Sequence, residues 1–181
     1  TAPKPGLTGL MCPEKLRKSL SLKCLDGLRV QAAASLYQTA ASNKKNRLLG
    51  QEQGEVLFRK YGLSGIAIFQ LSRIARQGEI HLDLFPSYTR SQLISILEER
   101  RKYLGSAKTE AFLNGMLHSK VGQAVLQRAS INLYGLAAQL KDHELASIAD
   151  VMKAWVFPIN ESNGWQQAQI TIGGLALNQF N

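Results

Sequence analysis

The stretch Gly54-Glu-Val-Leu-Phe-Arg-Lys-Tyr-Gly-Leu-Ser-Gly-Ile-Ala-Ile-Phe-Gln-Leu-Ser72 decides the fold, because its hydrophobic pattern changes period halfway along. Up to Phe58 the pattern is that of an extended segment, whereas from Leu63 to Ala75 the apolar residues recur at helical spacing. Ser64-Gly65 lies at the change, and we expect it to cap the helix. The stretch therefore predicts a strand, a tight turn of small residues and a helix near 64–76.

Strands are predicted on both sides of this stretch. Residues 27–37 alternate between apolar and polar, as in a half-buried strand, and a polar loop over 38–47 separates them from the extended segment 48–58. These segments predict an antiparallel hairpin with a long tip. Residues 79–85 alternate again before Pro86. The residues expected to face inward are Leu28, Val30, Ala32, Ala34, Leu36, Ile80, Leu82 and Leu84.

A helical region follows. Thr89-Arg-Ser-Gln92 has the form of a capping box, and the helix that it begins should end at Gly105. Shorter helical segments are predicted over 109–117, 120–128 and 133–140. Asp142 is expected to cap an amphipathic helix. The apolar faces of the first and last helices would carry Leu93, Ile96, Leu97 and Leu104, and Leu145, Ile148, Ala149, Met152 and Trp155.

The chain then returns to extended structure at 156–159 and again at 166–172, after the turn Asn160-Glu-Ser-Asn-Gly164. We expect the last strand to pair with the first ones, which places both ends on the β part, as in a domain inserted into another. The prediction is an α+β fold. A small antiparallel, barrel-like β lobe (1–87 and 155–181) contains a helical lobe (88–154).

The net charge of +9 raises the question of an anionic partner. Its clusters are Lys44-Lys45-Asn46-Arg47, interpreted as a solvated loop tip, and Arg100-Arg101-Lys102, interpreted as an exposed face of mixed charge. No aromatic residues interleave with either cluster to form a stacking platform for single-stranded nucleic acid. Nucleic-acid binding is therefore disfavoured, although a basic anion- or nucleic-acid-binding module stays an alternative.

Other residue types point to few sites. Cys12 and Cys24 have no metal-ligand or redox spacing, so we expect two reduced thiols in a cytoplasmic protein, with a disulfide or a sensor role as the alternative. The three histidines lack partners at metal spacing, so no metal site is predicted, and no catalytic triad can be argued from residue order. No apolar run is long enough for a membrane-spanning helix, and no secretory signal precedes the first strand, so we expect a soluble protein.

Several motifs carry a resemblance to a known family. They are Leu20-Ser-Leu-Lys23, Gly54-Glu-Val-Leu-Phe58, Tyr61-Gly-Leu-Ser-Gly65, Ile80-His-Leu-Asp-Leu84 and Gly164-Trp-Gln-Gln-Ala-Gln-Ile-Thr-Ile-Gly-Gly-Leu175. In this order they resemble the bacterial BaiN-like (YhiN-like) flavoproteins, a family of NAD(P)/FAD-dependent oxidoreductases and aminoacetone oxidases. The resemblance covers nearly the whole chain. It departs at Arg59-Lys60, where the family commonly has Thr-His or Thr-Asp, and at Ile66, where it usually has Pro.

The resemblance implies a particular place in a larger enzyme. In the family, an insert with a β part and a helical part interrupts an FAD-binding Rossmann domain, and this chain resembles that insert. The sequence contains no GxGxxG, the glycine-rich turn that lets a Rossmann domain approach a pyrophosphate. We therefore expect FAD to be bound in the parent by a Rossmann domain of the same polypeptide. The insert would cover the flavin, and alone it would bind no cofactor and be catalytically silent.

The same resemblance indicates two candidate segments. Thr171, Gly173 and Gly174 resemble the point where the chain re-enters the FAD domain, where glycines would let the backbone approach the cofactor. Tyr61, Gly62, Ser64 and Gly65 are interpreted either as a tight structural turn or as a segment facing flavin or substrate. A third functional alternative is a protein-interaction domain that self-associates as a homodimer through the surface meant for the FAD domain.

Overall fold

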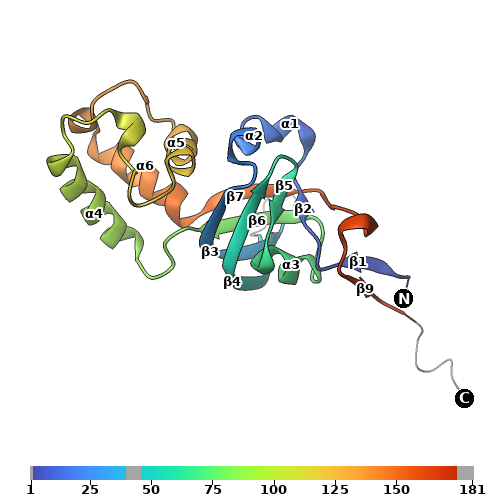
Figure 1. The fold of residues 1–181 in the computed structure, drawn as a ribbon. Helices are drawn as coiled ribbons and strands as arrows, with labels where there is room; N and C mark the ends of the chain where they lie inside the picture. Colours follow the sequence, from blue (N-terminus) through green and yellow to red (C-terminus); the bar gives the residue numbers. More distant parts are fainter. Residues whose placement is uncertain (1, 40–45, 175–181) are drawn as a thin grey trace, which may run out of the picture.

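A computed structural model of the chain describes residues 2–39 and 46–174, and its fold is α+β (Figure 1). A seven-stranded antiparallel sheet lies at the centre, in the order β7-β6-β3-β4-β5-β2-β8. Its strands are β2 (Leu10–Met11), β3 (Arg29–Gln38), β4 (Arg47–Arg59), β5 (Gly62–Ser64), β6 (Gly78–Asp83), β7 (Trp155–Ile159) and β8 (Glu161–Ser162). The predicted fold class is thus confirmed.

The sheet is barrel-like without being a closed barrel. Its two edge strands, β7 and β8, are consecutive in the chain and are separated by Asn160 alone. The amide of Asn160 donates to the carbonyl of Met11 at 3.1 Å, so the chain passes from one edge of the sheet to the other without leaving it. The sheet therefore curls until its edges meet through the backbone, while the hydrogen-bonded ladder stays open.

The predicted hairpin is β3 paired with β4, in a register that places Val30 opposite Val56 and shifts at a bulge between Leu36 and Tyr37. Of the predicted inward residues in these strands and β6, six are buried, namely Ala32, Ala34, Leu36, Ile80, Leu82 and Leu84, and Leu28 and Val30 pack partly buried against the core. The hairpin tip, including Lys44 and Lys45, lies outside the described residues.

Three of the predicted helices of this region form, and two do not. Between β6 and β7 lie α4 (Arg90–Tyr103), α5 (Ser119–Arg128) and α6 (Asp142–Lys153), which occupy one end of the molecule in Figure 1. α4 begins with the predicted capping box. The predicted helices over 109–117 and 133–140 are wrong, because only the 3₁₀ turns η1 (Thr109–Ala111) and η2 (Ala137–Gln139) form there.

Three residues of these helices also differ from expectation. Ile96 is 36% exposed, so it lies at the margin of the apolar face of α4. Asp142 is the first residue of α6 and not its cap, because Lys141 holds the cap position and donates its amide to the carboxylate of Glu144 at 2.7 Å. Trp155 belongs to β7, because Ala154 adopts φ −151° and ends the helix before it.

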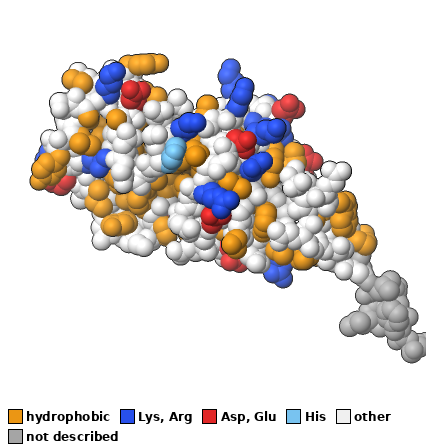
Figure 2. Space-filling model, viewed as in Figure 1, with side chains coloured by type: hydrophobic (Ala, Val, Ile, Leu, Met, Phe, Trp, Pro, Cys, Tyr) orange, Lys and Arg blue, Asp and Glu red, His pale blue; other side chains and the backbone are white. Residues whose placement is uncertain are grey.

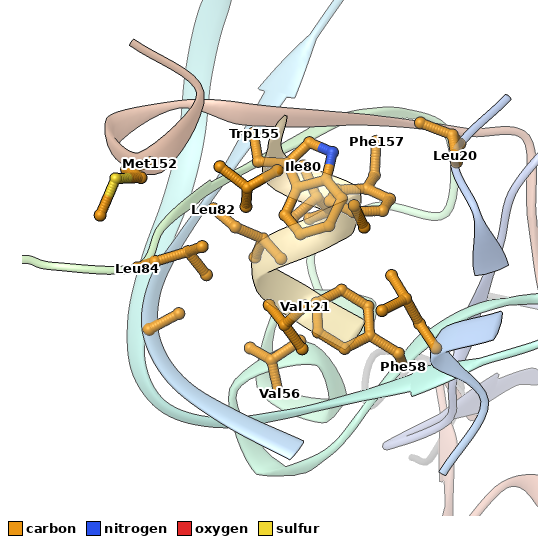
Figure 3. Close-up of a cluster of buried hydrophobic side chains, with 14 of the residues drawn as sticks. Leu20, Val56, Phe58, Ile80, Leu82, Leu84, Val121, Met152, Trp155 and Phe157 are labelled. Carbon is orange, nitrogen blue, oxygen red and sulfur yellow. The ribbon is translucent and has the colours of Figure 1, made fainter. Parts of the chain in front are cut away.

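A single cluster of buried side chains runs from the sheet into the helices. At its centre the rings of Phe58, Trp155 and Phe157 lie 5.0 to 6.0 Å apart in tilted contacts (Figure 3). Val121 of α5 and Met152 of α6 belong to the same cluster. Burying each such large side chain contributes about 1.5–3 kcal/mol. Because the core is continuous, the proposed boundaries at residues 88 and 154 stay a prediction about domain organisation.

The remaining elements lie around the sheet. They are α1 (Glu14–Arg17) and α2 (Leu22–Leu25) before β3, α3 (Ile66–Ser72) after β5, η3 (Trp165–Gln167) after β8, and the separate two-stranded ribbon of β1 (Lys4–Gly6) and β9 (Ile170–Ile172). The last strand pairs with the start of the chain, Lys4 opposite Ile172, although the proline-rich start was not predicted to be a strand. Both described ends therefore lie side by side, away from α4, α5 and α6 (Figure 1).

Candidate functional site

The Tyr61–Gly65 segment is built around close backbone approaches. β4 turns into β5, which places Arg59 opposite Gly62 and Phe58 opposite Leu63. On its other side β5 pairs with β2, and a Cβ built on Gly62 would lie 2.2 Å from the carbonyl oxygen of Leu10. Only glycine fits at this position, so the role of Gly62 in this structure is to let two strands approach.

Gly65 has a similar steric requirement together with an unusual backbone. It adopts φ +95° and ψ 170°, and its Cβ would lie 2.6 Å from the carbonyl oxygen of Glu55. Gly65 is the N-cap of α3 and has no side chain with which to cap. The expectation that Ser64 caps this helix is wrong, because Ser64 ends β5 and makes no capping hydrogen bond.

A hollow of about 350 Å³ brings part of this motif together with the C-terminal motif. Its lining residues are Leu57, Arg59, Tyr61, Ser64, Asn163 and Gln167. Leu57 and Arg59 come from β4, Tyr61 from the turn after it and Ser64 from β5, and the last two come from the segment after β8, about a hundred residues later. Segments that are distant in sequence thus form one polar concavity.

The short strand β2 explains why these segments meet. It pairs with β5 on one side, Met11 opposite Gly62, and with β8 on the other, Met11 opposite Glu161. Just before β2, the carbonyl of Gly9 accepts from the amide of Asn163 at 2.8 Å. A Cβ on Gly9 would lie 2.6 Å from the hydroxyl of Tyr61, so glycine allows this ring to lie against the backbone.

Arg59 gives the hollow its charge. Its Nε lies 3.4 Å from Oδ1 of Asp26, and the same carboxylate oxygen accepts from the amide of Lys60 at 3.0 Å. The side chains of Arg59 and Asp26 are 40% and 36% exposed. A partly solvated pair of this kind stabilises the fold little, so the guanidinium remains available to a ligand.

The second candidate segment lies elsewhere. Thr171 is exposed and stands opposite Pro5 in the ribbon, and Gly173 and Gly174 follow β9 with φ of 99° and 150°. None of these residues lines the hollow. Leu175, the last residue of the motif, lies outside the described residues. The cofactor role of Thr171, Gly173 and Gly174 therefore stays a prediction, as does a flavin- or substrate-facing role for the Tyr61–Gly65 segment.

The other titratable groups in the described part of the chain form no second site. Among residues 2–39 and 46–174, no group of three or more His, Cys, Asp or Glu side chains could hold a metal ion. His81 lies 3.2 Å from the carboxylate of Glu79 and 4.5 Å from the ring of Tyr37, which accounts for it structurally. Both cysteines are free thiols, as expected. No helix within the described ranges is long and apolar enough to cross a membrane.

The basic cluster at the end of α4 is largely engaged within the protein. Lys102 pairs with Glu99, Arg101 pairs with Asp142 at 2.8 Å, and Arg100 donates to the backbone carbonyls of Phe112 and Asn114. These contacts fit the interpretation as a face of mixed charge. They also tie α4 to the segments after it.

Comparisons with known proteins agree with this architecture of a barrel-like sheet joined to a helical part. Residues 4–170 match the family model described as "HI0933-like protein barrel and H2TH domain". The chain therefore belongs to the HI0933-like family of flavoproteins, and the resemblance that its motifs indicated is confirmed.

A curated relative gives the same assignment. The chain is similar to a 3-dehydro-bile acid delta(4,6)-reductase of Clostridium scindens, with 26% identity over 136 residues. The match covers 71% of this chain and 33% of the relative. The chain thus spans about a third of the length of the curated relative that it matches.

The sequence singled out two of the six residues that line the hollow. Tyr61 and Ser64 were candidates, and both line it. Asn163 and Gln167 were missed, although Gln167 lies inside the quoted C-terminal motif and Asn163 directly precedes it. The C-terminal family motif could have indicated both residues, because Asn163 directly precedes Gly164 and Gln167 lies two residues after Trp165.

Proposed function

We propose that this chain is the insert domain of an FAD-dependent oxidoreductase and that it covers the flavin and shapes access of the substrate. The observation that carries the proposal is the hollow in which the two family motifs meet. In this proposal FAD is bound by a Rossmann domain of the same polypeptide, and residues 1–181 alone perform no catalysis. The relative's name, a reductase, supports the reaction class.

The ribbon of β1 and β9 supports an insertion. Because Pro5 stands opposite Thr171, the segments that bracket the body of the protein lie side by side. Nη2 of Arg76 donates to the carbonyl of Pro5 at 2.7 Å, and the amide of Thr8 donates to the hydroxyl of Ser72 at 3.2 Å. These contacts hold the ribbon against the region of α3 and give the insert a defined orientation.

The surface at this end fits a partner domain. Hydrophobic side chains lie exposed at the end of the molecule that carries β1 and β9 (Figure 2). Trp165 is 53% exposed, Ile170 is 40% exposed and Ile66 is 67% exposed. Exposed apolar area of this kind is typical of an interaction surface. The FAD-binding domain is the partner proposed for it, and a homodimer through the same surface is the alternative outcome.

The backbone of the described residues offers little to bind FAD directly. The described residues contain no glycine-rich turn between a strand and a helix at which a pyrophosphate could be held. They do contain Gly173 and Gly174 at positive φ beside the ribbon, and a Cβ on Gly174 would meet nothing within 4 Å. The proposed role of Thr171, Gly173 and Gly174 is therefore to border the cofactor and not to bind it alone. When bound, FAD would supply the redox chemistry.

FAD retention tests the proposal. Residues 1–181 and the whole encoded polypeptide would be purified after incubation with FAD, and their visible absorbance compared. We expect stoichiometric flavin in the whole polypeptide and none in residues 1–181. Tight stoichiometric binding with flavin-coupled turnover by residues 1–181 would defeat the proposal.

The covering role needs a second measurement, made in the flavin-loaded polypeptide. Tyr61→Ala should change the flavin absorbance spectrum or the KM, because Tyr61 lines the hollow. Tyr134→Ala is the matched control, because Tyr134 is 93% exposed and lies in the helical part. Equal behaviour of both variants and the unchanged protein would count against a flavin-facing hollow.

A further inference from the structure

We propose that the hollow lined by Arg59, Tyr61, Ser64, Asn163 and Gln167 binds the carboxylate group of an organic ligand. The inference rests on the proposed function for the identity of that ligand as the substrate, and it adds the chemical class of the group that is recognised. Binding of a carboxylate is nevertheless a property of this chain that can be measured without flavin.

Most of the polar side chains that line the hollow have unused hydrogen-bonding groups. Within the described part of the chain, the hydroxyls of Tyr61 and Ser64 and the side-chain amides of Asn163 and Gln167 make no hydrogen bond to protein. Ser64 is 7% exposed, Tyr61 and Asn163 are half-buried, and Gln167 is exposed. Polar groups that are buried or half-buried normally find partners. An oxygen-rich ligand would supply one.

The hollow also carries a positive charge, which Arg59 supplies. Arg59 is the one lining side chain that carries a charge at neutral pH. None of the guanidinium nitrogens of Arg59 makes a hydrogen bond to residues 2–39 or 46–174. A guanidinium presents paired N–H donors that match the two oxygens of a carboxylate. Tyr61, Ser64 and the two amides can donate further hydrogen bonds to the same oxygens.

The charges around the hollow favour a ligand group with a single negative charge. Asp26 lies 3.4 Å from Arg59 and offsets part of its positive charge. Lys60 adds only its backbone amide, which is bound to Asp26. One partly neutralised cation suits a carboxylate better than a doubly charged phosphate, which usually requires several cationic or amide donors. Leu57 is the one apolar lining residue, so the hollow holds the polar end of a ligand.

The experiment uses residues 1–181 labelled with ¹⁵N and titrated with sodium acetate at constant ionic strength. Acetamide, which has nearly the same shape without the charge, and inorganic phosphate are the comparison probes. The signals followed are the Nε–H of Arg59 and the side-chain amides of Asn163 and Gln167. We expect acetate to shift them saturably, and acetamide and phosphate to bind more weakly.

Variants assign the binding to the hollow. Arg59→Gln should weaken acetate binding about tenfold or more, as expected for loss of a charge-assisted hydrogen bond. Ser64→Ala should weaken it about twofold to tenfold, as expected for a neutral hydrogen bond. Arg90→Gln is the matched control, because Nε of Arg90 also donates to an aspartate, Asp150, but Arg90 lies on α4 and does not line the hollow. It should bind acetate as the unchanged protein does.

The outcomes separate the two proposals. Acetate shifts that do not saturate, that persist equally in Arg59→Gln, or that acetamide reproduces would overturn the carboxylate site. Tighter binding of phosphate than of acetate would overturn the ligand class. Each of these results leaves the flavoprotein proposal standing, since no flavin is present. Conversely, failure of the whole polypeptide to retain FAD leaves the acetate measurement unaffected.

Discussion

Replacing Gly65 by alanine tests whether this motif glycine has a structural role. Gly65 adopts φ +95° with ψ 170°, a region that is essentially restricted to glycine, and forcing another residue into it costs about 1–3 kcal/mol. The added Cβ would also lie 2.6 Å from the carbonyl oxygen of Glu55 and 3.0 Å from the amide nitrogen of Leu57. Relieving such overpacking costs about 1–3 kcal/mol more.

Gly65→Ala should therefore lower the free energy of unfolding by about 2–6 kcal/mol, out of the about 5–15 kcal/mol that holds a typical domain together. At about 2–4 °C per kcal/mol for a chain of this size, Tm should fall by about 4–24 °C. Urea unfolding followed by tryptophan fluorescence measures the first quantity, and calorimetry measures the second.

Gly164→Ala is the matched control for this experiment. Gly164 adopts φ +74° and ψ −177°, nearly the same backbone region, but a Cβ there meets nothing within 4 Å. Gly164→Ala should lower the free energy of unfolding only by the cost of the backbone conformation, about 1–3 kcal/mol. If Gly65→Ala and Gly164→Ala lose equal stability, the close approach to β4 does not constrain Gly65, and the structural reasoning for this glycine fails.

Three further predictions concern single side chains. In the native protein a thiol reagent at pH 8 should modify Cys24, which is exposed, and spare Cys12, because burial raises the pKa of the Cys12 thiol to about 12. In denaturant both thiols should react, and rapid modification of Cys12 in the native protein would contradict the prediction. Arg90 lowers the pKa of Asp150 through a side-chain hydrogen bond. The pair therefore stabilises the fold at pH values above the ordinary pKa of a carboxyl group, and this stabilisation is lost as the pH falls through the lowered pKa of Asp150. Arg90→Gln should thus be slightly less stable than the unchanged protein at pH 7, and the gap in urea midpoint should close in acid; a constant gap would refute the link to titration. Thr8→Val should raise the unfolding free energy by about 1 kcal/mol, because the buried Thr8 hydroxyl has no partner in the described structure; a loss of stability would show that the hydroxyl is bonded.

The longer strands and most helices follow from local patterns, and the misses have local causes. Alternation over 27–37 and 79–85 predicts β3 and β6, because each strand buries one face. The predicted helix over 109–117 fails at Gly115, which adopts φ +87°. Trp155 follows Met152 at helical spacing, but the helix ends before it. Spacing alone does not reveal that break.

The shortest strands escape prediction for a different reason. β2 has two residues and β8 has two, too few to display any period. Their pairing is specified by contacts across the fold, such as Met11 opposite both Gly62 and Glu161. A pattern within a window of sequence carries no information about such partners.

The same cause explains why only two of the six lining residues of the hollow could be predicted. Tyr61 and Ser64 are recognisable from their motif, but nothing in that motif specifies that Asn163 lies beside them. Their proximity depends on β2, which supplies no lining residue yet separates β5 from β8 by a single strand. Gly9 then holds Asn163 by a hydrogen bond and leaves room for the Tyr61 ring. The geometry of the hollow is therefore set by backbone positions that carry no chemistry of their own, and a search of the sequence for reactive side chains passes over them.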